Sequence, residues 1–303
     1  MKKIDLLLGI FVTGIWGANF SVIKLGLDTL DPFLLTSIRF TFCAIPLIFF
    51  IKKPNVRLSI IALYGFLFGV GLWGVVNLGI YWGLSAGLAS LILQFSAFFT
   101  IVLAALTFGE KISKFQIAGI SVALIGLILI LTVTGGNVSK VGAALVILGA
   151  ICWSSCNIIV RKNKPDNMLA FIVWSSLFSA IPLFLITYLV KGAQPFYSLP
   201  QTINNTAIFS ILFQSYITTI FGYWVWNSLM KKYPVSSVAP LSLFVPVSGL
   251  ITSWLVFDEH IGMGKIIAAL LILSGMAIFL YAKSIDGYFR SRATDLCSIN
   301  EEM

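Results

Sequence analysis

The feature that most constrains this chain is a series of apolar runs, each about 20 residues long, separated by short polar breaks. A helix of that length matches the roughly 30 Å hydrocarbon thickness of a bilayer. Only 10% of the 303 residues are charged and 59% are hydrophobic, whereas soluble domains carry about 25% charged residues. Such a chain could not cover its own surface in water. The sequence therefore predicts an all-α integral membrane protein.

The runs divide the chain into ten expected transmembrane helices. The breaks between them hold turn-forming or helix-stopping residues, such as Asp31-Pro32, Gly135-Gly136-Asn137 and Lys164-Pro165. The expected helices span residues 4–25, 33–51, 59–82, 87–108, 114–133, 141–160, 168–190, 206–230, 235–257 and 264–283. Residues 284–303 follow as a polar tail with no helical periodicity.

The basic residues predict the orientation, because Lys and Arg concentrate in cytoplasmic loops. With the N-terminus inside, fifteen of the 20 Lys and Arg fall on the inner side, four fall on the outer side, and Arg39 lies within a span. Both termini are therefore expected to be cytoplasmic. The same clusters account for the net charge of +9, so a nucleic-acid partner is not expected.

The two halves of the chain resemble each other. A shift of 149 residues places Phe108-Gly109-Glu110 on Phe257-Asp258-Glu259. Since each half holds an odd number of helices, five, the second copy would cross the membrane upside down relative to the first. Inverted repeats recur in secondary transporters, with the substrate near the midplane. We expect a first repeat at 1–135, a second at 136–283 and a cytoplasmic tail at 284–303.

Signatures of enzymes and metal sites are missing from the sequence. His260 is the single histidine, and HExxH, GxSxG and P-loop motifs do not occur. Cys152 and Cys156 lie four residues apart in an apolar run without a CxxC motif, which is typical of cysteines that pack in a core. We therefore expect no enzymatic activity, no cofactor and no metal site.

Polar side chains within the apolar runs indicate a cavity, because such groups are costly in lipid and usually functional, although amides also join helices. The Arg39 side chain either extends to the outer lipid headgroups, pairs with Asp31 or Asp28, or attracts a substrate carboxylate. The same alternatives apply to Lys24. The predicted cavity residues are Trp16, Asn19, Asn77, Tyr81, Gln94, Trp153, Asn157 and Tyr223. Lys24 and Arg39 are assigned to carboxylate attraction or gating, and Glu110 and Glu259 are acidic residues at corresponding repeat ends.

Several motifs together resemble a known family. They are Trp16-Gly17-Ala18-Asn19-Phe20, Ser37-Ile38-Arg39-Phe40, Gly87-Leu88-Ala89-Ser90, Phe108-Gly109-Glu110 and Ala239-Pro240-Leu241-Ser242-Leu243. Over residues 1–281 the chain is similar to the EamA family of the drug/metabolite transporter superfamily, and within it to bacterial exporters of amino-acid metabolites. The resemblance implies export of O-acetylserine, cysteine and similar small amino acids, a bacterial inner membrane location, and a cavity between the two halves.

Two alternatives stay open at this point. The same fold could export or import other metabolites or drugs, because a fold does not fix a substrate, and a receptor or assembly subunit would transport nothing. The expected partners are a small-molecule substrate and the lipid bilayer. The sequence leaves the oligomeric state, the direction of transport and the coupling ion open, since no carboxylate sits in the middle of an expected span.

Overall fold

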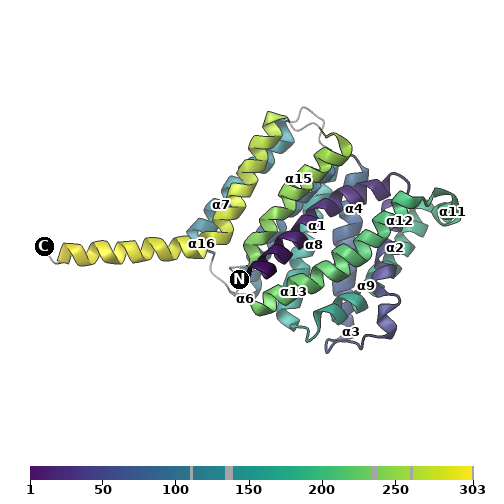
Figure 1. Cartoon of the computed structure of the whole chain (residues 1–303), viewed down its shortest axis with the longest axis horizontal. Helices are drawn as coiled ribbons and strands as arrows, with labels where there is room; N and C mark the ends of the chain where they lie inside the picture. The colour runs from purple at the N-terminus through teal and green to yellow at the C-terminus, as the bar shows by residue number, and fades with distance from the viewer. Residues whose placement is uncertain (110–111, 134–138, 234–237, 260–261, 302–303) are drawn as a thin grey trace.

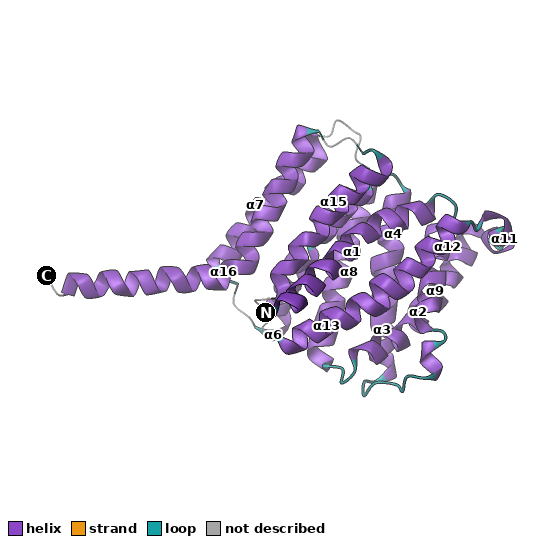
Figure 2. Ribbon diagram, in the orientation of Figure 1, coloured by secondary structure: helices purple, strands orange, loops and turns teal. Residues whose placement is uncertain are grey.

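The structure is a computed structural model and describes residues 1–109, 112–133, 139–233, 238–259 and 262–301. Its regular elements are helices, and no strand occurs among these residues (Figure 2). Eight helical segments of the described chain are long and apolar enough to cross a membrane. Two shorter apolar helices, Lys114–Leu129 and Leu241–Phe257, lie where the fifth and ninth spans are expected.

The helices follow one another in two halves. The first half contains α1 (Lys3–Leu27), α2 (Pro32–Ala44), η1 (Leu47–Phe49), α3 (Leu58–Phe66), η2 (Leu67–Gly74), α4 (Val75–Tyr81), α5 (Ala86–Leu93), α6 (Ser96–Phe108) and α7 (Lys114–Val133). The second half contains α8 (Lys140–Asn163), α9 (Met168–Lys191), α10 (Gln194–Tyr197), α11 (Leu199–Thr202), α12 (Asn205–Leu212), η3 (Phe213–Phe221), α13 (Gly222–Lys232), η4 (Ala239–Leu243), α15 (Phe244–Phe257) and α16 (Met263–Glu301).

Local sequence explains where α2 begins and ends. The Asp31 carboxylate accepts hydrogen bonds from the backbone N–H groups of Phe33 and Leu34, at 2.9 and 3.1 Å, which caps the helix. The helix stops at Ala44 because Pro46 cannot donate a backbone hydrogen bond and disfavours helical geometry in the preceding residue. The expected helix over 33–51 is therefore shorter, with a 3₁₀ turn after it.

Three of the described spans are interrupted near their middles, and a fourth begins with a 3₁₀ helix. The third span of each half contains a π-helical stretch, η2 in the first and η3 in the second. The fourth span of the first half breaks at Gln94, between α5 and α6. A shift of 149 residues carries Gln94 to Leu243, the last residue of the 3₁₀ helix η4 before α15. Departures from α-helical geometry inside a span often mark functional sites.

Helices from the two halves pack against each other in matching pairs. The second span of one half, α2, packs along the second span of the other, α9, and α7 packs along α16 in the same relation. Figure 1 shows the α7–α16 pair at one side of the bundle. Gly119 and Gly275 allow this pair to approach closely, because a Cβ at either position would lie 2.6 Å from the other residue's carbonyl oxygen.

The C-terminal segment differs from the expected tail. Helix α16 does not end near residue 283 but continues to Glu301, and Figure 1 shows its end projecting away from the bundle. The tail was expected because residues 284–303 show no apolar periodicity. A helical backbone outside the core needs no such periodicity, and no proline interrupts residues 263–303.

Candidate substrate cavity

A cavity of about 570 Å³ lies between the two halves of the chain, which contribute equally to its lining. This volume is in the range of pockets that hold small organic molecules. Seven of the predicted residues line it: Trp16, Asn19, Arg39, Gln94, Trp153, Asn157 and Tyr223. The lining also includes Val160, Met168 and Met230, which lie at the helix ends predicted to be cytoplasmic. The cavity therefore extends from the middle of the bundle toward that side.

Arg39 lies in the cavity wall and is 1% exposed. Its guanidinium donates hydrogen bonds to Gln214 Oε1 at 3.3 Å and to Thr219 Oγ1 at 2.9 Å, both in η3. Its Cζ lies 4.4 Å from the ring centroid of Trp73, a cation–π contact. Asp31, one partner considered for Arg39, caps α2 instead. Among the described residues no carboxylate pairs with Arg39, so its charge faces only neutral groups.

Aromatic rings form much of the remaining wall. The Trp16 ring centroid lies 5.2 Å from that of Tyr223 and 5.3 Å from that of Trp226. Trp153, from the second half, lies 6.1 Å from Tyr223. The Trp16 indole N–H is fixed by a 2.9 Å hydrogen bond to the carbonyl of Thr218 in η3. Such a wall can hold an ammonium group by cation–π attraction or an apolar side chain by contact.

Three of the predicted amides also reach this cavity. Asn19 lies in α1, Gln94 lies at the break between α5 and α6, and Asn157 lies in α8. The Asn157 amide also donates to Thr100 Oγ1 at 3.2 Å, so it joins α8 to α6 as well as lining the cavity. The Asn19 Oδ1 atom is buried and has no hydrogen-bond partner. The three amides therefore offer a polar molecule both hydrogen-bond donors and hydrogen-bond acceptors.

Two predicted cavity residues lie elsewhere. Asn77 is fully buried in α4 and donates to Thr36 Oγ1 of α2 at 2.8 Å, so its amide joins two helices. Tyr81 is 51% exposed at the far end of the same span, where it lines a second pocket of about 270 Å³ with Asp28 and Lys191. Position within a span does not reveal which face of a helix a side chain occupies, so the sequence could not place these two side chains.

Two further predicted residues, Lys24 and Glu259, do not line the cavity. The Lys24 ammonium lies 4.0 Å from the ring centroid of Phe257, at the opposite end of α1 from Lys3. Glu259 accepts a hydrogen bond from Ser253 and forms a 3.5 Å ion pair with Lys265. Glu110 lies outside the described residues.

Close packing of α1, α5 and α15 closes the cavity on the predicted outer side. A Cβ added at Gly17 would overlap the Val245 carbonyl oxygen, and one added at Gly249 would overlap Ser90 Oγ. Further out, Ser21 Oγ donates to Thr252 Oγ1 at 3.2 Å. Small residues allow helices to approach this closely in a membrane. The cavity thus extends toward one side of the bundle and is sealed toward the other.

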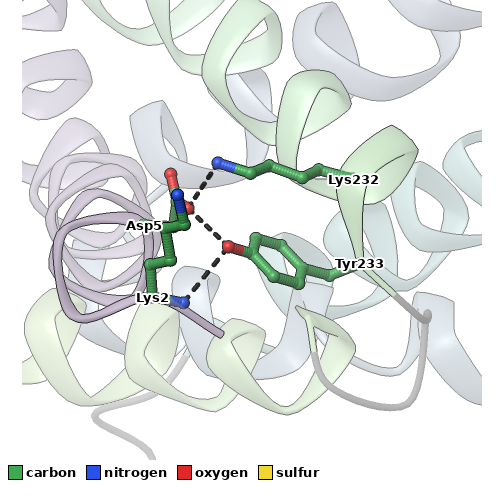
Figure 3. Close-up of polar contacts among 4 residues, drawn as sticks. All are labelled: Lys2, Asp5, Lys232 and Tyr233. Carbon is green, nitrogen blue, oxygen red and sulfur yellow. Dashed lines mark hydrogen bonds and ion pairs between the residues drawn. The ribbon is translucent and has the colours of Figure 1, made fainter.

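A polar cluster ties α1 to α13 at the predicted cytoplasmic side (Figure 3). The Lys232 ammonium and the Tyr233 hydroxyl donate to Asp5 Oδ2 at 2.7 and 2.5 Å. The backbone N–H of Lys2 donates to the Tyr233 hydroxyl at 3.1 Å. The hydrogen bond to Asp5 raises the pKa of Lys232 above its ordinary value. The cluster joins the two halves, since α1 and α13 belong to different ones.

Several residues of the cavity wall are not among the predicted site residues, including Tyr64, Trp73 and Thr218. Trp73 and Thr218 lie in η2 and η3. A π-helical stretch changes the number of residues per turn, so a 3.6-residue pattern cannot place the side chains there. Trp73 stands out in the sequence only as one tryptophan among eight. Within the described residues no cluster of three His, Cys, Asp or Glu side chains could hold a metal ion.

Comparison with known proteins agrees with this architecture. A solved crystal structure superimposes with a TM-score of 0.60 at 17% identity, covering 92% of this chain and 96% of the other, which concerns the fold alone. The chain is 35% identical over 287 residues to the "Probable amino-acid metabolite efflux pump" of Escherichia coli K12, covering 93% of this chain and 96% of the relative.

A second relative and a family profile also match this chain. The corresponding protein of Salmonella typhimurium is 35% identical over 300 residues, covering 97% of this chain and 98% of that protein. The profile of the "EamA-like transporter family" matches residues 3–132 and 140–281, nearly the whole of both halves. These relatives are transporters and not enzymes. This chain is therefore a multi-pass membrane protein that belongs to the EamA-like transporter family.

Proposed function

We propose that this transporter exports small amino acids or their metabolites, such as O-acetylserine and cysteine, across a bacterial inner membrane. The names of two relatives, amino-acid metabolite efflux pumps, support the substrate class and the direction. Another relative is named an inner membrane transporter. The proposal that this chain shares the substrate class and the direction of transport rests on the chemistry of its cavity.

The observation that carries the proposal is the Arg39 guanidinium in the cavity wall. A buried cation inside a membrane protein is costly unless it is compensated, and its usual role is functional. Gln214 and Thr219 hold the guanidinium but leave its charge in place. A substrate carboxylate would neutralise that charge, while the rings of Trp16 and Tyr223 would contact the rest of a small amino acid.

Alternating access between two inverted five-helix repeats is the proposed mechanism, with both termini cytoplasmic. The matching interruptions in the two halves, and the pairing of α2 with α9 and of α7 with α16, support the repeat. In this arrangement the cavity faces the cytoplasm, and the packing of α1 against α15 closes the outer side. Export requires α1 and α15 to part after the substrate has bound.

Counterflow in proteoliposomes tests this proposal. Vesicles loaded with unlabelled cysteine or O-acetylserine should accumulate the labelled compound when they contain the wild-type protein. Arg39→Ala should lower this exchange at least tenfold, because the carboxylate loses a charge-assisted contact worth roughly 1.5–3 kcal/mol. The matched control is Arg57→Ala, which removes an exposed cation at the start of α3 and should exchange like wild type.

One alternative substrate class has an observation in its favour. Most of the wall consists of aromatic and aliphatic side chains, including Trp153, Trp226 and Met230, and such a wall suits apolar drugs. Folded wild-type protein that exchanges no amino acid, yet moves a hydrophobic dye, would support that alternative. Specific binding of amino acids without any flux would instead favour a receptor.

A further inference from the structure

Trp73 occupies an unusual position in the cavity wall. It lies in the π-helical stretch η2, is 8% exposed and lines the cavity. The face of its indole ring lies against the Arg39 guanidinium, with 4.4 Å between the Arg39 Cζ and the ring centroid. The Phe20 ring, also in the cavity wall, lies 6.0 Å from the Trp73 ring between ring centroids.

The Trp73 indole N–H has no hydrogen-bond partner, although it is buried. Trp16 and Trp174 behave differently, because their indole N–H groups donate to backbone carbonyls at 2.9 and 3.0 Å. A buried Trp N–H ordinarily finds a partner, because leaving a buried donor unpaired is unfavourable. An unpaired donor in a binding cavity is explained when the substrate supplies the acceptor.

Arg39 presents a second unpaired donor in the same wall. Its Nη1 and Nη2 atoms donate to Gln214 and Thr219, whereas its Nε is buried and has no partner. An indole N–H and a guanidinium N–H are both donors only, and neither can accept a hydrogen bond. The group that satisfies such a pair must be an acceptor, preferably an anionic one with two oxygens, which describes a carboxylate.

We propose that Trp73 is a specificity-determining residue that donates its indole N–H to the carboxylate of the transported amino acid, beside the Nε–H of Arg39. This inference rests on the proposed function and deepens it, because it names the group that selects acids over uncharged analogues. Both donors are shielded in this structure, so the carboxylate reaches them only after a neighbouring side chain moves.

The test compares a carboxylate with its uncharged counterpart in wild-type and Trp73→Phe protein. Phenylalanine keeps an aromatic face for Arg39 and removes the N–H. In proteoliposomes, cysteine and cysteinamide compete with labelled cysteine, and the half-inhibitory concentration of each is measured. Their ratio does not depend on how much of the variant is folded. Trp254→Phe, a change at a half-exposed tryptophan of α15 outside the cavity lining, is the matched control.

The proposal expects Trp73→Phe to raise the half-inhibitory concentration of cysteine by about 10- to 100-fold, the loss of one hydrogen bond to a charged group. The value for cysteinamide should rise less than about threefold, and Trp254→Phe should change neither. Equal weakening of both compounds would mean that Trp73 only supports the wall and would overturn the inference, as would no change in either. A wild-type protein that exchanges no cysteine would instead overturn the proposed function, and this inference with it.

Discussion

Asn77 and Asn157 carry the same amide in similar apolar runs, yet they have different surroundings. Asn157 lines the cavity, whereas Asn77 is wholly buried between α4 and α2 and bonded to Thr36. A sequence shows that an amide side chain lies at membrane depth, but it does not show which neighbouring helix that side chain contacts. Arg39 was identifiable from sequence because a lone cation in a span is rare, while its neutral partners Gln214 and Thr219 depend on how α2 meets η3.

Replacing Asn77 by Leu should therefore affect stability more than transport. The change removes the bond to Thr36, and interhelical hydrogen bonds of this kind contribute roughly 0.6–2 kcal/mol. The melting temperature of the purified protein should fall, while the KM for amino-acid exchange stays within about twofold of wild type. Asn19→Leu, within the cavity wall, should show the opposite pattern. A raised KM with unchanged melting for Asn77→Leu would contradict this assignment.

At the scale of elements, eight of the ten expected spans correspond to described helices long and apolar enough to cross a membrane, whereas the π-helical interruptions were not predicted. A span must hold enough consecutive apolar residues to cross the bilayer, so hydropathy reveals the spans in the sequence. Hydropathy does not reveal the π-helical stretches η2 and η3, because they depend on packing between helices. Proline marked the end of α2. The prolines of α10 and α11 stand at helix starts, within a segment expected to be a loop.

The close contact between α1 and α15 can be tested with two glycine substitutions in α1, one of which is the control. Gly17→Ala should lower the free energy of unfolding by about 1–3 kcal/mol, because the new methyl group overlaps the Val245 carbonyl and forces the helices apart. Gly14 lies one turn away on the same helix with open space around it. Gly14→Ala should be neutral, or stabilising by up to about 1 kcal/mol. Equal melting temperatures for the two variants would argue against this close approach.

The cluster of Asp5, Lys232 and Tyr233 predicts coupling between α1 and α13. Asp5→Asn and Lys232→Met should each lower the melting temperature, and the double variant should lose less than the sum of the two, because both changes break the contact between Asp5 and Lys232. The ammonium contributes below the ordinary lysine pKa, and its contribution is lost as the pH rises through the raised value. Lys3→Met, at an exposed position, is the control. Additive losses in the double variant would show that the pair is not coupled.

At the scale of the whole molecule, the sequence predicted the all-helical class, and the family resemblance implied a cavity between the two halves. The sequence could not predict the continuation of α16, since hydropathy describes only the part of a helix that lies in lipid. The proposed orientation still depends on the distribution of basic residues. The orientation can be tested by an experiment that does not measure transport.

Single cysteines introduced into a cysteine-free variant would test that orientation. Asn55 lies in the exposed loop before α3, and Gln201 lies exposed in α11. In intact cells an impermeant thiol reagent should modify Gln201→Cys but not Asn55→Cys. Permeabilised cells should allow both to react. Modification of Asn55→Cys in intact cells would reverse the proposed topology, and with it the side toward which the cavity faces.

The central claim is that the cavity between the halves is the site of transport. An experimental structure of the protein with cysteine or O-acetylserine tests it most directly. We predict density in that cavity, with the carboxylate at Arg39 and the remainder of the molecule against Trp153 and Tyr223. Density confined to the second pocket, near Asp28 and Lys191, would contradict it.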